Sequence, residues 1–148
     1  MIMASRAKIT RVVLTDKPEA DFVLIGLVST EADYKVSQLI NKKLSISLKH
    51  QKTVDIEINS GVKESFSRYA FSTGTPEVNY YLISNRSEKN CIFNKLKKID
   101  YLFIIQDHDN ACNIDLIASR LREIEKITAL FRLNPEEIKD KNLAYITP

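Results

Sequence analysis

The most apolar run in the chain is Ile99-Asp100-Tyr101-Leu102-Phe103-Ile104-Ile105-Gln106. The run is too short to span a membrane, which needs roughly 20 consecutive apolar residues. Its β-branched and aromatic side chains favour a strand. A strand that is apolar on both sides is typical of the middle of a sheet whose two faces are both covered. We therefore expect residues 99–106 to form the central strand of the fold.

The residues that follow this run predict a helix and then another strand. After a polar loop at residues 107–110, apolar side chains recur at helical spacing, namely at Ile114, Ile117, Ala118, Leu121 and Ile124. Residues 127–133 are short and rich in residues that favour strands. A strand, a helix and a strand in this order are typical of a unit that places its helix on one face of a sheet.

Patterns elsewhere predict the other strands and helices. Strands are expected at residues 8–14, 21–28, 54–58, 64–72 and 78–84, where apolar or alternating residues lie between turn residues. A second main helix is expected to begin near Thr30, which can cap it, and to end near Leu44. Asn134 as a cap and Pro135 at the first helical position predict a short C-terminal helix.

Together these elements predict an α+β fold. We expect a mostly antiparallel sheet of about six or seven strands, with the two main helices on one face. The order of the elements around a hairpin resembles a split βαβ, ferredoxin-like arrangement. The 148 residues are expected to form a single domain, with residues 1–7 flexible.

Composition narrows the class of protein. Hydrophobic residues are 44% and charged residues 28% of the chain, which is ordinary for a soluble globular protein. The net charge of +3 is too small to indicate a nucleic-acid or membrane partner. Cys91 and Cys112 form no C-x-x-C motif, and the first residues lack the apolar core of a signal peptide. We expect reduced thiols in a cytoplasmic protein.

Two groups of polar residues are candidates for chemistry. Asp107, His108 and Asp109, with Cys112 shortly after, contain metal-ligating side chains, but their spacing matches no zinc pattern. Asp109 or Asn110 as a cap for the following helix explains this group better, so we expect neither a metal nor a cofactor. Asp100 begins a buried strand and needs a partner. Arg86 is the expected partner, in a salt bridge that holds the hairpin or, alternatively, in a clamp for a ligand carboxylate.

Features typical of enzymes and of nucleic-acid binders are weak. Asp55 and Glu57 alternate with apolar residues, so a solvated strand face explains them better than acid–base catalysis. Neither histidine belongs to a nucleophile motif. Tyrosines on strands and scattered lysines are features of sheets that stack bases. However, the chain lacks an RNP-like pattern, and acidic residues are interspersed among the lysines.

Several short motifs resemble the bacterial IPExxxVDY family. Residues 93–101 match the second half of its name-giving motif, with Ile99-Asp100-Tyr101 for Val-Asp-Tyr, whereas Phe93-Asn94-Lys95 stands where the family has Ile-Pro-Glu. Residues 21–26, 33–35, 39–41 and 80–86 are also similar. The resemblance implies a soluble cytoplasmic protein, and the family has no assigned activity from which catalytic residues could be carried over. The shared residues, together with Arg86, are the candidate ligand-binding or partner-binding residues: Asp33, Tyr34, Asn41, Asn85, Arg86, Asp100 and Tyr101.

Three functions are consistent with these observations. The favoured one is a non-enzymatic interaction module that binds a protein partner or a second copy of itself, through a sheet edge or through the face without helices. The alternative is a regulatory domain that senses a small molecule near Asp33, Asn85 and Arg86. The third is nucleic-acid binding, which would weaken steeply with salt.

Overall fold

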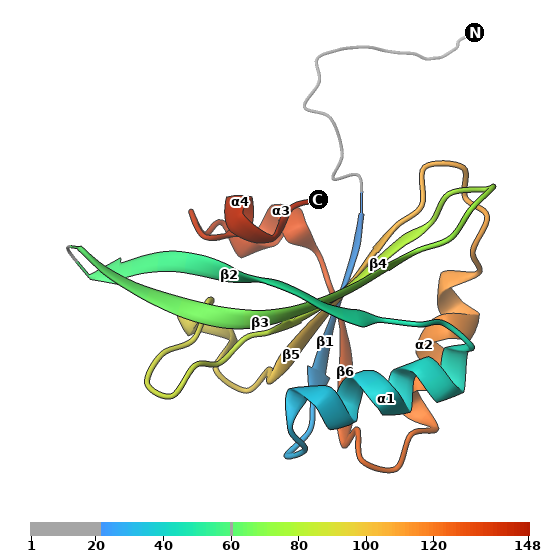
Figure 1. Cartoon of the computed structure of the whole chain (residues 1–148), viewed down its shortest axis with the longest axis horizontal. Helices are drawn as coiled ribbons and strands as arrows, with labels where there is room; N and C mark the ends of the chain where they lie inside the picture. Colours follow the sequence, from blue (N-terminus) through green and yellow to red (C-terminus); the bar gives the residue numbers. More distant parts are fainter. Residues whose placement is uncertain (1–21, 60) are drawn as a thin grey trace, which may run out of the picture.

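The computed structural model describes residues 22–59 and 61–148, whose six strands form one antiparallel sheet (Figure 1). The strands are β1 (Val23–Val28), β2 (Lys49–Asn59), β3 (Val62–Ser72), β4 (Asn79–Ser84), β5 (Tyr101–Gln106) and β6 (Ala129–Leu133). The helices are α1 (Asp33–Leu44), α2 (Ile114–Arg122), α3 (Pro135–Ile138) and α4 (Leu143–Ile146), with one 3-10 turn, η2 (Asn94–Leu96). The predicted α+β class is therefore confirmed.

The apolar run of residues 99–106 forms the centre of this sheet, as predicted. The strand order is β2-β3-β4-β5-β1-β6, so β5 lies between β4 and β1. Four consecutive β5 residues, Leu102 to Ile105, have no exposed surface. Because successive side chains of a strand point to opposite faces, this burial requires a cover on both faces of the sheet.

The first cover is supplied by α1 and α2, which lie together on one face (Figure 1). Val36 and Ile40 of α1 and Leu121 of α2 are completely buried against that face. The place of α2 follows from the strand directions. Both β5 and β6 run antiparallel to β1, so they are parallel to each other with β1 between them. The β5–α2–β6 unit is therefore a split βαβ crossover, as the sequence predicts.

The second cover is the part of the fold that sequence patterns missed. The opposite face is covered by the connection between β4 and β5 (residues 85–100), which buries Ile92, Phe93 and Ile99. The buried Ile146 of α4 packs on the same face. The face opposite α1 and α2 is therefore covered by this connection and by the C-terminal segment.

The helix ends match the sequence predictions in one case and differ in another. Asn134 caps α3, since its side-chain oxygen accepts a hydrogen bond from the Glu136 amide at 3.0 Å, and Pro135 is the first helical residue. In contrast, α1 begins at Asp33 with Ala32 at the cap position, so the prediction of Thr30 as the cap is wrong. The strand predicted at residues 8–14 and the flexibility predicted for residues 1–7 lie outside the described residues.

No helix in residues 22–59 and 61–148 is both long enough and apolar enough to cross a bilayer.

Gly26 of β1 marks the closest approach between the sheet and the β4–β5 connection. A Cβ at this position would lie 2.7 Å from Cδ1 of Ile99, a buried side chain of the connection. Glycine inside a strand is typical of such a close approach. The absence of a side chain at Gly26 therefore lets the connection lie directly on β1.

We predict that Gly26→Ala lowers the free energy of unfolding by about 1–3 kcal/mol, because the added methyl group overpacks this contact. Gly74→Ala is the matched control, since a Cβ at Gly74 meets no atom within 4 Å. Urea unfolding of both variants tests the prediction. Ile99→Val removes the clashing Cδ1. It should therefore lower the free energy of unfolding by less in the Gly26→Ala variant than in the natural chain. Equal losses for the two glycine variants would contradict this account.

Candidate functional site

Asn85 holds the β4–β5 connection in place from within the core. Its side chain is completely buried. The side-chain amide donates to the carbonyl oxygens of Leu96 (3.0 Å) and Ile99 (2.8 Å), and the side-chain oxygen accepts from the Phe93 amide (3.2 Å). A buried amide with these three partners has little capacity left for a ligand. Asn85 is therefore a structural residue of the connection.

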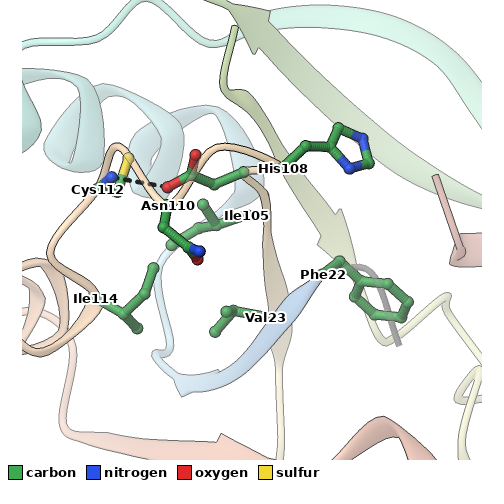
Figure 2. Close-up of a pocket in the computed structure, with 8 residues that line it drawn as sticks. Phe22, Val23, Ile105, His108, Asn110, Cys112 and Ile114 are labelled. Carbon is green, nitrogen blue, oxygen red and sulfur yellow. Dashed lines mark hydrogen bonds between the residues drawn. The ribbon is translucent and has the colours of Figure 1, made fainter. Parts of the chain in front are cut away.

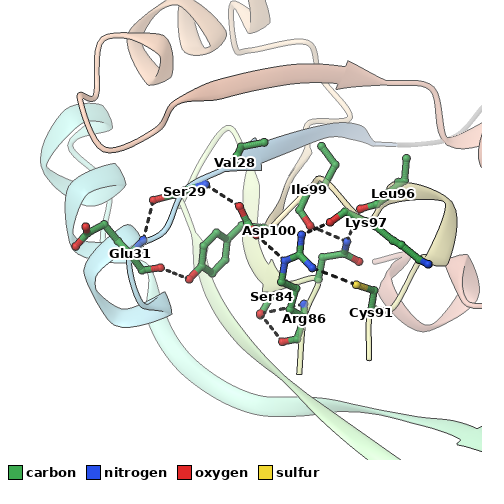
Figure 3. Close-up of polar contacts among 12 residues, drawn as sticks. Val28, Ser29, Glu31, Ser84, Arg86, Cys91, Leu96, Lys97, Ile99 and Asp100 are labelled. Atoms are coloured by element: carbon green, nitrogen blue, oxygen red, sulfur yellow. Dashed lines mark hydrogen bonds and ion pairs between the residues drawn. The ribbon is translucent and has the colours of Figure 1, made fainter. Parts of the chain in front are cut away.

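Arg86 and Asp100 form the predicted salt bridge where β4 ends and β5 begins (Figure 3). Arg86 Nε donates to Asp100 Oδ1 at 2.6 Å. The remaining guanidinium nitrogens contact the Lys97 carbonyl oxygen and the Cys91 thiol. The hydrogen bond to Asp100 raises the pKa of Arg86. Since its nitrogens all contact this chain, the arrangement favours a structural bridge over a clamp for a ligand.

Asp100 and Tyr101 also tie β5 to the turn between β1 and α1. The second carboxylate oxygen of Asp100 accepts from the Ser29 amide at 2.9 Å, and the Tyr101 hydroxyl donates to the Glu31 carbonyl oxygen (Figure 3). Burial, with a smaller contribution from the Asp33 and Asp100 carboxylates, raises the pKa of Tyr101 to about 12. The Asp-Tyr pair thus joins three segments that are distant in sequence.

The other candidate residues lie apart from this joint or serve the chain locally. Asp33 accepts a hydrogen bond from the next amide in the first turn of α1, and Tyr34 is 61% exposed. Asn41 makes two hydrogen bonds with the main chain of Leu48, which connects α1 to β2. The structure therefore brings Asn85, Arg86, Asp100 and Tyr101 together but does not gather the whole set around one cavity.

The polar loop at residues 107–110 lies beside a cavity of about 270 Å³ between the start of β1, the end of β5 and α2 (Figure 2). Asp107 accepts hydrogen bonds from the main-chain amides of Ala111 and Cys112, at 3.0 and 2.7 Å. It therefore shapes the loop itself. The cap of α2 is Asn113, whose side-chain oxygen accepts from the Leu116 amide at 3.1 Å, so the prediction of Asp109 or Asn110 as the cap is wrong. His108 and Asp109 are exposed. Nowhere in the described residues do three histidine, cysteine, aspartate or glutamate side chains lie close enough to hold a metal ion.

Cys112 lines the same cavity and contacts Tyr80, with 3.4 Å between its sulfur and the tyrosine oxygen. Burial raises the pKa of the Cys112 thiol and that of the Tyr80 hydroxyl. A raised pKa lowers the thiolate fraction at neutral pH, and the thiolate is the nucleophilic form. These features disfavour nucleophilic chemistry at Cys112.

A different surface lies along β6, the last strand of the sheet. Residues 129–133 pair with β1 at five consecutive positions, and no described strand pairs with the outer edge of β6. Phe131 is 47% exposed at this edge. Phe131 pairs with Gly26, so it lies on the face covered by the β4–β5 connection, whereas Leu130 packs in the core under the helices.

A groove borders β6 on each face of the sheet. The first, which we call the loop-side groove, has a volume of about 460 Å³ and an apolar floor of Leu96, Ile99, Phe131 and Leu133. The second, the helix-side groove, has a volume of about 400 Å³ and is lined by Arg122, Ile127, Thr128, Ala129, Leu130 and Phe131. Phe131 is common to both grooves.

Sequence reasoning missed this edge, although two signals were present. Gly26 in a buried strand indicates that another segment approaches closely. That segment is the β4–β5 connection, which forms the wall of the loop-side groove. The second signal is the charged Arg132 next to Phe131 in a short strand. It is easily overlooked, because an aromatic residue in such a strand is usually assigned to the core. Only the strand order identifies β6 as the edge at which the Phe131 ring is exposed.

We predict that Asn85→Ala lowers the free energy of unfolding by roughly 2–4 kcal/mol, because the Ile99 carbonyl oxygen and the Phe93 amide lose their side-chain partner and the Leu96 carbonyl oxygen loses one of its two. Asn94→Ala, at an exposed asparagine of the same connection, should change it by less than about 0.5 kcal/mol. Urea unfolding of the two variants provides the comparison. A similar small loss in both would mean that Asn85 does not hold the connection.

We also predict a stability loss at alkaline pH that depends on Tyr101. Its folded-state pKa of about 12 lies above the value of about 10 for an unfolded tyrosine. The resulting stabilisation is complete below about pH 10 and is lost as the pH rises from about 10 to about 12. Tyr101→Phe removes this titration, so its free energy of unfolding should fall less over that interval. Tyr34→Phe should follow the natural chain; a Tyr101→Phe profile that also follows it would refute the prediction.

Comparison with known proteins finds no matching family model, no matching curated protein and no matching solved structure. The resemblance to the IPExxxVDY family therefore stays a prediction from short motifs.

Proposed function

We propose that the protein is a non-enzymatic interaction module that binds an extended segment of a partner protein along the outer edge of β6. The main support is that this edge has a groove on each face of the sheet. A strand added to a sheet edge points its side chains alternately to the two faces. Main-chain hydrogen bonds then supply affinity, and pockets for alternate side chains supply specificity.

The opposite edge of the sheet is less suited to strand addition. β2 has register shifts between Gln51 and Val54 and between Glu57 and Asn59, and its residues Lys49 and Lys52 are exposed. Bulges and lysines are devices that keep an edge from pairing with another chain. In contrast, β6 is regular and exposes Phe131. These differences favour β6 as the binding edge.

The residues suggested by the motifs have supporting roles in this proposal. Asn85, Arg86 and Asp100 hold the connection that forms the wall of the loop-side groove. Their side chains are engaged within the chain, so a small-molecule sensor that uses Asn85 and Arg86 has less support. We also propose a cytoplasmic location, because Cys91 and Cys112 are free thiols, and unpaired thiols are typical of reducing compartments.

We predict that peptides selected from a random displayed library on the full chain bind at β6. For such a peptide, Phe131→Thr should weaken binding by about tenfold or more, because the half-exposed Phe131 side chain lines the loop-side groove next to this edge. Val62→Thr is the matched control: it is also an exposed apolar strand residue, but it lies in β3, with β4, β5 and β1 between it and β6.

The second readout is amide hydrogen exchange. A bound strand should slow the exchange of amides within residues 129–133, and it should leave residues 49–59 of the opposite edge unchanged. Binding that is unaffected by Phe131→Thr, or protection that appears only elsewhere, would refute the proposed function.

A further inference from the structure

Basic residues line the groove on each face of β6. Lys95, Lys97 and Lys98 lie along the loop-side groove. All three are exposed, and they make no ion pair with another residue of the described chain. Arg122 lines the helix-side groove. This density of cations contrasts with the small net charge of +3 for the whole chain.

Three carboxylates near this surface are paired within the chain. Asp100 is paired with Arg86 and Asp115 with Arg132, which lines the loop-side groove. Glu123, at the end of α2, is paired with Lys43. Lys95, Lys97 and Lys98 form no ion pair with a described carboxylate, and a bound carboxylate would relieve the repulsion among these three like charges.

From this charge distribution we infer that the segment bound at β6 is an acidic peptide strand with an apolar centre. This inference rests on the proposed function and names the partner's chemistry. On the loop side, apolar side chains fill the floor formed by Leu96, Ile99 and Phe131, and aspartate or glutamate side chains face the lysines. Because alternate residues of a strand share one face, the acidic and apolar residues on this side are two positions apart. The alternate residues of the bound peptide face the helix-side groove, and at least one of them is apolar.

The same charges argue against a second copy of this chain as the occupant. In a pair joined through two β6 strands, the loop-side grooves of the two copies would face each other across the new strand pair. Lys95, Lys97 and Lys98 of one copy would then approach the same lysines of the other, and like charges brought together in an interface are unfavourable. An acidic segment turns this repulsion into attraction.

The test compares random-peptide selections on the natural full chain and on the triple variant Lys95→Glu, Lys97→Glu, Lys98→Glu. Peptides selected on the natural chain should be enriched in aspartate and glutamate beside an apolar centre. The triple variant should select lysine and arginine at those positions instead. The matched control is Lys49→Glu, Lys52→Glu, Lys63→Glu, which makes the same change in charge at exposed lysines of the β2–β3 hairpin. This control should keep the preference for acidic peptides.

Affinity measurements on one selected acidic peptide complete the test. The substitutions at Lys95, Lys97 and Lys98 should weaken its binding by about tenfold or more at low salt, and the difference should shrink as salt screens the exposed charges. The substitutions in the hairpin should leave the affinity within about twofold of the natural chain.

Several outcomes would overturn the inference, and they distinguish it from the proposed function. Peptides that bind at β6 and depend on Phe131 but show no enrichment in acidic residues would refute the acidic partner while leaving the proposed function in place. The absence of any peptide that depends on Phe131 would refute both. A homodimer that Phe131→Thr dissociates would identify a second copy as the occupant. Displacement of the acidic peptide by an oligonucleotide but not by excess acidic peptide of another sequence would identify a nucleic-acid site.

Discussion

Burial of β5 on both faces is the constraint on which the rest of this structure depends. A central strand with no exposed residue from Leu102 to Ile105 needs apolar partners above and below the sheet. Two amphipathic helices supply one layer. The other layer is largely an irregular connection, and an irregular segment can lie over a core only if its main-chain polar groups find partners. Asn85 meets this requirement by bonding three main-chain groups of the connection.

The polar residues that stand out in the sequence are explained by this packing. Arg86, Asp100 and Tyr101 join the ends of β4 and β5 to the turn that precedes α1. Buried polar groups of this kind are satisfied by their neighbours and specify how the segments meet. In the sequence, these polar residues suggest a functional site. In the structure, their contacts instead anchor the connection that shapes the adjacent groove.

The two edges of the sheet differ in ways that bear on function. The β2 edge is long, bulged and lysine-bearing, whereas the β6 edge is short and regular and is flanked by apolar grooves. The β4–β5 connection creates the loop-side groove because it crosses β1 at Gly26 and stops short of β6. The same anchor that completes the core therefore produces the surface at which we propose that a partner strand binds.

Local sequence patterns were sufficient to locate the six described strands, although β2 begins at Lys49 and not at Val54 as expected. They also predicted the two main helices, the cap of α3 and the pairing of Arg86 with Asp100. Each of these depends on the periodicity of neighbouring residues, on the unpaired amides of a first helical turn or on the cost of burying an unpaired charge. Sequence patterns failed for the cover of the second face, because an irregular connection and two short helices have no period to detect. They also failed for the binding edge. Which strand lies at the edge, and where Phe131 points, depends on contacts between β1, β6 and Ile99, which are distant in sequence, so only the tertiary structure decided them.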